Sequence, residues 1–201
     1  MEPLPEDEAV RRLHAQYTVA RALAESSSLR EAASGILQAI CEALRWDYAG
    51  LWQVDAAQGV LRCVETWSSP GVSFPEFEAV SRQMTFVPGI GLPGRVWRSG
   101  EPFFAPDIIH DPNFPRGKVV ARAGLHAALG VPVLIGREVI GVLEFFSREI
   151  GRPDAELLEM LATIGSQIGQ FAERKRTEAE LATLFDTSPD MLCIAGVDGT
   201  F

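Results

Sequence analysis

The segment from Val131 to Phe146 constrains the fold more than any other part of the chain. Two nearly continuous apolar runs, 131–135 and 138–146, flank the dipeptide Gly136-Arg137. Apolar runs on both sides of a short turn that contains glycine are typical of a β-hairpin whose strands are covered on both faces. The sequence therefore predicts a sheet with other elements packed above and below it.

A second hairpin is predicted earlier in the chain. Residues 48–54 and 60–67 are rich in aromatic and β-branched side chains, and a five-residue loop that ends in Gly59 separates them. The middle of the chain between the hairpins is rich in Gly and Pro, which break regular elements. Only short elements are expected there, namely a helix over 93–98, an edge strand near Phe103 and Phe104, and a helix over 117–123.

Helices are predicted before the first hairpin and after the second. Apolar residues at helical spacing indicate a helix over about 6–24, with Val10, Leu13 and Tyr17 on one stripe. Ser28 followed by Glu31 is a capping-box signal for a second helix. A long last helix begins at Pro153, which suits a first helical position, and carries apolar residues in steps of four and three, at Leu157, Leu161, Ile164, Ile168 and Phe171. Hairpins between helices define an α+β fold with an antiparallel sheet.

Composition excludes several function classes. The 201 residues carry a net charge of −9, which argues against nucleic acid as a partner, because phosphate contacts need clustered Lys and Arg. Cys41, Cys63 and Cys193 suggest neither a disulfide framework nor a metal site, so a cytoplasmic location is expected. No apolar run approaches the roughly 18 residues that span a bilayer, so no membrane segment is predicted. The basic residues gather at 95–122, where five of them outnumber three acidic ones.

Four motifs, in this order, give the sequence a resemblance to the GAF domains of bacterial signalling proteins. They are GLPGRVW at 91–97, DIIHDPNFPR at 107–116, GLHAALGVPV at 124–133 and VIGVLEFFS at 139–147. The resemblance implies an antiparallel sheet of five or six strands, with the first and last helices on one face and an irregular helical lid on the other. In those GAF domains that bind a ligand, the ligand lies under this lid.

The last residues, 184–201, resemble the start of a PAS domain. Together the two resemblances imply a division into an N-terminal dimerisation helix (1–27), a GAF domain (28–172), a signalling-helix linker (173–183) and a truncated PAS start (184–201). They also imply a sensory module of a two-component signalling protein, a sensor histidine kinase, that forms a parallel homodimer. The two apolar stripes would form the dimer interface, or they would pack on their own sheet within one chain.

The resemblance also bears on ligands and catalysis. No cysteine lies between Val64 and Leu192, so the thioether that holds a covalent bilin and the cysteines of methionine sulfoxide reduction are both missing. Residues 147–156 depart from the set that binds cyclic nucleotides. His110 and His126 fit a turn and the interior better than a haem ligand. We therefore expect no cofactor, no metal and no catalytic activity in this segment, and leave an unknown small molecule as a possible ligand.

Eight residues are candidates for a ligand site: Trp67, Arg95, Trp97, Asp107, His110, Phe114, Arg122 and His126. Their aromatic rings would form an apolar pocket with a few polar contacts, or they would simply fill the core. The arginines would bind an anion, be solvated, or pair with nearby acids. Glu144 either faces water at an edge or is buried beside an arginine. Two functions stay open: a ligand-coupled sensor, or a ligand-free spacer that dimerises.

Overall fold

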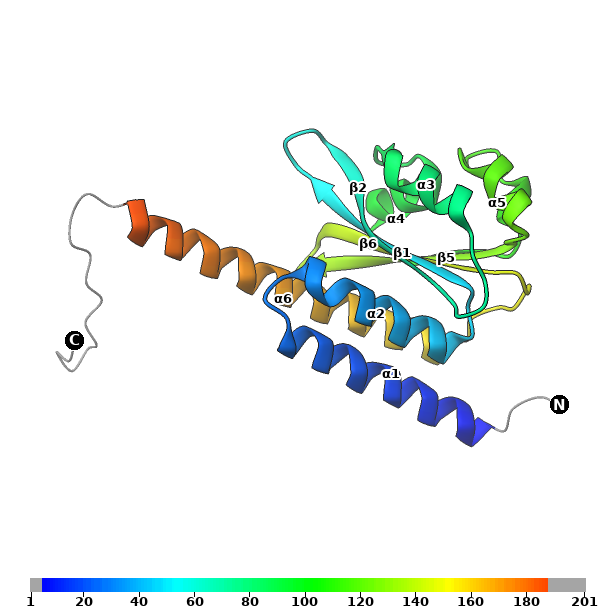
Figure 1. The fold of residues 1–201 in the computed structure, drawn as a ribbon, viewed down its shortest axis with the longest axis horizontal. Coiled ribbons are helices and arrows are strands. Elements are labelled where there is room, and N and C mark those ends of the chain that lie inside the picture. The colour runs from blue at the N-terminus through cyan, green and yellow to red at the C-terminus, as the bar shows by residue number, and fades with distance from the viewer. Residues whose placement is uncertain (1–4, 188–201) are drawn as a thin grey trace.

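The structure is a computed structural model and describes residues 5–187 (Figure 1). The helices are α1 (Pro5–Glu25), α2 (Leu29–Leu44), α3 (Pro75–Gln83), α4 (Gly91–Ser99), the short 3-10 helix η1 (Ile108–His110), α5 (Gly117–Ala123) and α6 (Ala155–Thr187). The strands are β1 (Tyr48–Asp55), β2 (Val60–Ser68), β3 (Thr85–Phe86), β4 (Phe103–Ala105), β5 (Ala127–Ile135) and β6 (Glu138–Ser147). None of the described helices has the length and apolarity needed to cross a bilayer.

The six strands form one antiparallel sheet in the order β3-β2-β1-β6-β5-β4. Both predicted hairpins are confirmed, and they meet where β1 pairs with β6 at the centre of the sheet. The turn at Gly136 has φ 60°, a left-handed conformation that favours glycine. The predicted α+β fold class is therefore confirmed, with six strands.

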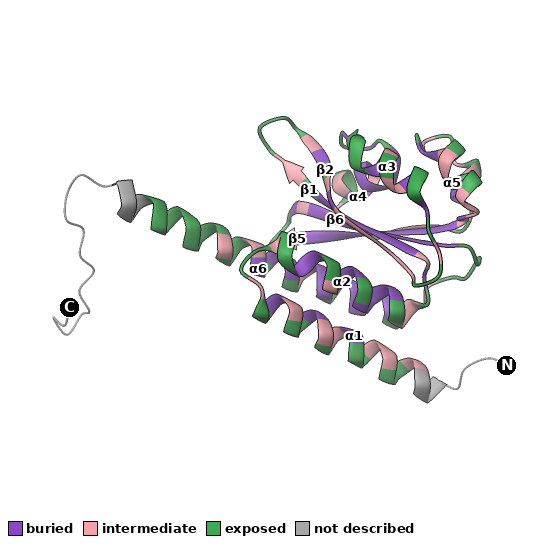
Figure 2. Ribbon diagram, in the orientation of Figure 1, coloured by how far each residue is buried: buried purple, intermediate pink, exposed green. Residues whose placement is uncertain are grey.

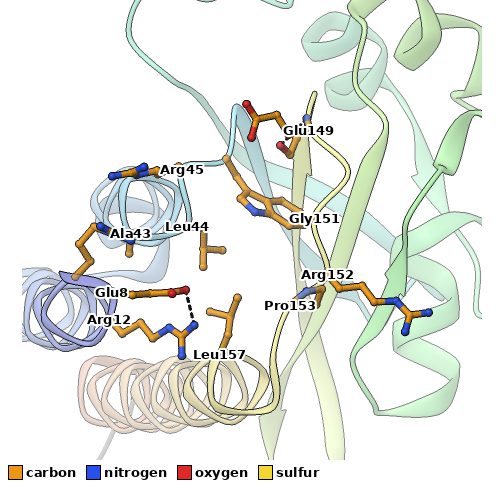
Figure 3. Close-up of a pocket in the computed structure, with 13 residues that line it drawn as sticks. Glu8, Arg12, Ala43, Leu44, Arg45, Glu149, Gly151, Arg152, Pro153 and Leu157 are labelled. Atoms are coloured by element: carbon orange, nitrogen blue, oxygen red, sulfur yellow. Dashed lines mark hydrogen bonds and ion pairs between the residues drawn. The ribbon is translucent and has the colours of Figure 1, made fainter. Parts of the chain in front are cut away.

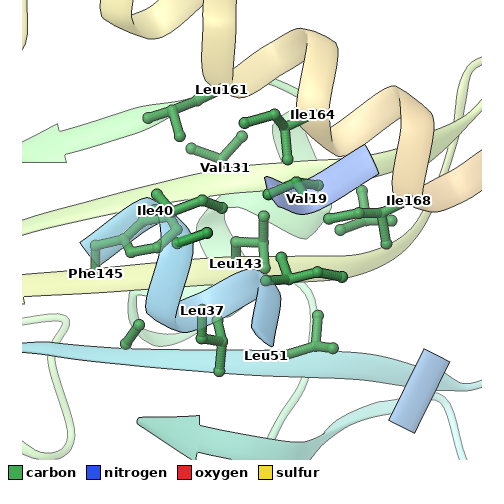
Figure 4. Packing of buried hydrophobic residues seen from close by; sticks show 14 of the residues in the cluster. Val19, Leu37, Ile40, Leu51, Val131, Leu143, Phe145, Leu161, Ile164 and Ile168 are labelled. Atoms are coloured by element: carbon green, nitrogen blue, oxygen red, sulfur yellow. The ribbon is translucent and has the colours of Figure 1, made fainter. Parts of the chain in front are cut away.

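Helices cover both faces of this sheet. On one face, α2 and α6 lie directly on the strands and α1 lies outside them (Figure 1). The core on this side joins side chains from all three helices to β1, β5 and β6, among them Val19, Ile40, Leu143 and Ile164 (Figure 4). On the other face lie α3, α4, η1 and α5, here called the lid, above two smaller apolar clusters. Both faces of β5 and β6 are accordingly buried (Figure 2).

The two apolar stripes that were predicted to form the dimer interface differ in burial. Leu157, Leu161, Ile164, Ile168 and Phe171 are 0–7% exposed, because they pack on the chain's own sheet. Their assignment to a dimer interface is therefore wrong, since a second chain cannot reach buried side chains. Val10, Leu13 and Tyr17 are instead 64–67% exposed, because α1 turns a different stripe toward the core, formed by Ala15, Val19 and Leu23.

Helix α6 lies unusually close to β5. A Cβ atom added to Gly165 would overlap the carbonyl oxygen of Pro132, and one added to Gly169 would overlap that of Leu134. Glycine at these two positions lets the helix backbone rest directly on the strand. Beyond Phe171 the helix leaves the sheet and runs away from the domain (Figure 1). This part contains the predicted linker at 173–183, which is helical as expected.

Other parts of the sequence prediction are confirmed or extended. Ser28 caps α2 by accepting a hydrogen bond from the backbone N–H of Glu31, and α4, β4 and α5 form where short elements were expected. The helix α3 was not predicted. The predicted PAS start at 184–201 lies outside the described residues, except for the last turn of α6.

Candidate functional site

A fully buried ion pair joins the lid to the sheet. Arg116, the residue just before α5, donates from Nη1 and Nη2 to the two carboxylate oxygens of Glu144 on β6, at 2.8 and 2.6 Å. Both side chains are 0% exposed. Nη1 also donates to the hydroxyl of Ser81 on α3, at 2.8 Å. The planar guanidinium thus meets the carboxylate through two parallel hydrogen bonds, the strongest geometry for such a pair.

Aromatic rings surround the guanidinium of Arg116. Its central carbon lies 4.9–5.5 Å from five ring centroids, those of Trp52, Phe77, Phe86, Phe114 and Phe146. A cation within about 6 Å of a ring face is attracted by the π electrons, more strongly when water is excluded. We call these five rings, with Ser81 and Glu144, the arginine cage. The cage is built by β1, α3, β3, the segment before α5, and β6.

Glycines make room for the carboxylate at the centre of the sheet. The cross-strand neighbours of Glu144 are Gly50 on β1 and Gly130 on β5. A Cβ atom at Gly50 would lie 3.1 Å from Oε1 of Glu144, and one at Gly130 would lie 2.6 Å from Val96 of α4. The missing side chain at Gly50 therefore leaves room for the carboxylate of Glu144, and the one at Gly130 leaves room for Val96 of α4.

Of the eight predicted site residues, Phe114 lies in the cage. Arg95 on α4 is next to it in the lid, where it forms a bidentate ion pair with Asp111 at 2.5 and 2.6 Å and stacks 4.8 Å over Phe103. Burial acts to raise the pKa of Asp111, but the hydrogen bonds from Arg95 and from backbone outweigh it and hold the pKa below its usual value. This pair fastens the loop that carries Arg116 onto α4.

Three of the predicted residues form a separate cluster at the outer edge of the lid. Asp107 caps η1 and lies 2.7 Å from Nδ1 of His110, while Nδ1 of His126 is 3.8 Å away. The bond to His110 lowers the pKa of Asp107. His110 is 81% exposed in its side chain and His126 is 40% exposed. His110 is thus the exposed last residue of η1, where a turn was expected, and His126 is only partly buried.

The last three predicted residues are not members of the cage, and they lie in three different places. Arg122 forms an exposed ion pair with Glu76 across the gap between α3 and α5. Trp97 packs at the far end of α4, near Trp52 and Val96. Trp67 packs on the opposite face of the sheet, against the α2 side. The eight residues therefore do not form a single pocket.

The cage contains residues that sequence reasoning did not place in the site. Arg116, Trp52 and Phe146 are not among the eight candidates, and Arg116 enters the sequence analysis only through the motif at 107–116 and the basic stretch at 95–122. The open question about Glu144 is settled, because it is buried beside an arginine. Three arginines of the basic stretch, Arg95, Arg116 and Arg122, pair with carboxylates, so the excess positive charge there is largely compensated.

A pocket of about 250 Å³ lies outside the lid between α1, α2 and the start of α6 (Figure 3). Arg12 of α1 lines this pocket and bonds to Glu8 at 2.6 Å, to Asp154 just before α6 at 2.5 Å, and to Glu156 in the first turn of α6 at 3.2 Å. The hydrogen bond from Arg12 lowers the pKa of Asp154. These contacts tie the first helix to the beginning of the last one.

The thiol of Cys63 lies close to the lid side of the sheet. Burial, helped by the negative charge of Glu144, raises the pKa of Cys63 to about 12, so the thiol stays protonated at neutral pH. Among the residues that the structure describes, no three His, Cys, Asp or Glu side chains are placed to hold a metal ion.

A six-stranded antiparallel sheet with long helices on one face and a lid over a buried site on the other is the architecture of a small regulatory domain. The chain belongs to the GAF domain family, whose sequence model matches residues 26–173. GAF domains are sensory and regulatory modules of signalling proteins. A comparison with curated proteins gives no match.

Solved structures support the same fold. The GAF domain from a phosphoenolpyruvate-protein phosphotransferase of Coxiella burnetii superposes with a TM-score of 0.72 at 20% identity, over 86% of this chain and 98% of that one. Free methionine-R-sulfoxide reductase from Neisseria meningitidis superposes with a TM-score of 0.68 at 16% identity, over 89% of this chain and 97% of that one. A domain of a proposed two-component sensor histidine kinase from Sinorhizobium meliloti superposes with a TM-score of 0.55 at 24% identity, over 73% of this chain and 91% of that one.

Proposed function

We propose that this chain is the regulatory GAF segment of a cytoplasmic sensor histidine kinase, and that it passes the state of its lid along α6 to the part of the protein that follows. The structural similarity to a domain of a proposed sensor histidine kinase from Sinorhizobium meliloti supports the choice of parent protein. The route within the domain is supported by contacts of the strand β5.

The observation that carries this proposal is that β5 touches the lid and α6 at almost the same place, on opposite faces. On the lid side, Gly130 lies against Val96 and Leu92 of α4. On the other side, Pro132 and Leu134 lie against the backbone of α6 at Gly165 and Gly169. Close-packed interiors have little free volume, so a shift of α4 cannot be absorbed within β5 and must move α6. Loosening the lid should therefore speed amide hydrogen exchange in α6.

The outer part of α6 suits a transmitting role. Beyond Phe171 its side chains are mostly exposed and form pairs within the helix, such as Lys175 with Glu178 at 2.9 Å and Arg176 with Glu180 at 3.6 Å. Exposed pairs of this kind contribute little to stability. A polar helix held so weakly tolerates alternative packing against a second helix, which allows its crossing or register to change with the state of the domain.

Dimerisation is the second part of the proposal, and α1 would provide the interface. Val10, Leu13 and Tyr17 form a solvent-exposed apolar stripe beside the start of α6, and a second copy in parallel orientation would cover it. We expect Leu13→Glu to convert a dimer to a monomer at micromolar concentration in light scattering. Val87→Glu is the matched control, because Val87 is exposed but lies between β3 and α4 and not on α1. A wild-type protein that is monomeric at high micromolar concentration would contradict the proposed dimer.

The alternative function is a ligand-free spacer whose role is dimerisation. One observation favours it, namely that the space under the lid is filled by Arg116 and Glu144. A spacer would bind no small molecule under its lid, and the two functions therefore differ in whether a ligand can replace the side chain of Arg116.

A further inference from the structure

We infer that the arginine cage is a binding site for a small organic cation that carries a guanidinium group, and that Arg116 is the built-in occupant of this site in the unliganded protein. The inference supplies an input to the regulatory module proposed above, and it rests on that proposal only for the effect on signalling. Binding itself depends on the residues of the cage.

The chemistry of the cage selects for a guanidinium group. Glu144 accepts two parallel hydrogen bonds, at 2.6 and 2.8 Å, which matches the fork of a guanidinium and not the single point charge of an ammonium. Ser81 accepts a third. The five rings supply an apolar wall that attracts a cation of either kind. The carboxylate therefore makes the site specific for a guanidinium group. The rings increase the affinity of the site for a cation.

Arg116 fits this cage incompletely. Its Nε is buried and has no hydrogen-bond partner among the residues that the structure describes, while both Nη atoms have partners. An unsatisfied buried donor costs free energy, so Arg116 is held less tightly than a fully hydrogen-bonded guanidinium would be. A free ligand that brings its own guanidinium keeps the contacts to Glu144 and Ser81 and releases Arg116. The exchange replaces one ion pair by an equivalent one and leaves no buried charge alone.

A pocket on the surface gives a route to the cage. It has a volume of about 280 Å³ and lies between α3 and α5, lined by Phe77 among others. The ring of Phe77 also lies 4.9 Å from the guanidinium carbon of Arg116, so this residue belongs both to the lining of the pocket and to the cage. Glu76 and Arg122 pair across the pocket, and both side chains are 58% exposed. Such an exposed pair opens at little cost, and Glu76 could then bind an amine at the other end of the ligand.

Isothermal titration calorimetry with agmatine, which carries a guanidinium and an amine, tests the inference. Because Arg116 competes for the cage, removing it should strengthen binding of the free ligand. We expect Arg116→Ala to bind one agmatine per chain about tenfold more tightly than the wild type does. Putrescine, which has an amine in place of the guanidinium, should bind at least about tenfold more weakly than agmatine. Adding Glu144→Gln to Arg116→Ala should abolish agmatine binding.

Several results would overturn the inference. Equal affinities of the wild type and Arg116→Ala, binding that survives Glu144→Gln, or equal affinities for agmatine and putrescine would show that the cage is not the site. No binding to the wild type at about 100 times the dissociation constant of Arg116→Ala would show that Arg116 is never displaced.

Arg116→Ala leaves Glu144 without a partner and can fail to fold. In that case its thermal unfolding is followed with each amine present. Recovery of a cooperative transition with agmatine and not with putrescine supports the inference, and no recovery with either overturns it. Binding without any change in α6 would contradict the proposed function and leave the site intact, so the two failures can be told apart.

Discussion

Glu144→Leu is expected to lower the free energy of unfolding by about 3–5 kcal/mol, because it leaves the guanidinium of Arg116 buried without a counter-ion. The five rings attract a cation but do not supply the hydrogen-bond acceptors that two of its nitrogens need. The lid holds Arg116 at 0% exposure, so water cannot take the place of the carboxylate unless the lid opens. Denaturant-induced unfolding measures the change.

Two further variants show whether the effect belongs to the buried pair. Adding Arg116→Met to Glu144→Leu removes both charges and should recover most of the loss, since well-packed apolar groups replace buried ion pairs at little cost. Asp55→Ala breaks the partly exposed pair with Arg62 on the β1–β2 hairpin and should cost no more than about 1 kcal/mol. A double variant as unstable as Glu144→Leu alone would show that the ion pair is not what holds the lid.

Gly169→Ala is expected to lower the free energy of unfolding by about 1–3 kcal/mol, because the added methyl group overlaps the carbonyl oxygen of Leu134 and pushes α6 away from β5. The direction is informative, because alanine in place of glycine within a helix normally stabilises by about 1 kcal/mol. The loss therefore reports the contact with β5 and not the intrinsic preference of the helix. Thermal and denaturant unfolding measure it.

Gly35→Ala in α2 is the matched control. A Cβ atom at Gly35 would lie 3.5 Å from that of Ala22, an ordinary van der Waals contact. This variant should stabilise the protein by about 0.5–1 kcal/mol. If both glycine variants stabilised the protein equally, the close packing of α6 on β5 would be refuted.

Local patterns were sufficient for the strands and for most helices. Continuous apolar runs beside a turn defined one hairpin, aromatic and β-branched runs beside a loop defined the other, and the capping pair Ser28 and Glu31 defined the start of α2. The helix α3 was not predicted because Pro75–Gln83 is polar and has few apolar residues at helical spacing. Phe77 is the only large side chain that is buried within this helix. Its place is fixed by contacts with β2 and α5, which are distant in sequence.

A β-bulge explains why Trp67 was wrongly placed near the lid. The pairing of β1 with β2 shifts between Leu51 and Trp52, where one extra residue of β2 interrupts the alternation of faces. Cys63 therefore lies on the lid side, whereas Trp67, four residues later, lies on the side of α2. Strict alternation would put both on one face.

The partner of an apolar helical stripe is also hard to read from sequence. Steps of four and three along α6 suit a second helix and suit a sheet equally well, and here the stripe packs on β5. Gly165 and Gly169 were the residues that indicated packing on a strand, because glycines on the same face of a helix permit close contact with a backbone. The arginine cage could not be predicted, since its members come together only when the lid folds over the sheet.

Amide hydrogen exchange along α6, measured by mass spectrometry on a variant with a loosened lid, tests the proposed transmission most directly. Asn113→Ala removes the side-chain hydrogen bonds that tie the loop before α5 to Gly89 and Gly91, at 2.9 and 3.2 Å. Asp55→Ala, at the hairpin loop, is the control. We predict that Asn113→Ala raises exchange rates at 155–171 about fivefold, equivalent to about 1 kcal/mol, while the control leaves them unchanged. Faster exchange in the lid with unchanged exchange in α6 would contradict the account.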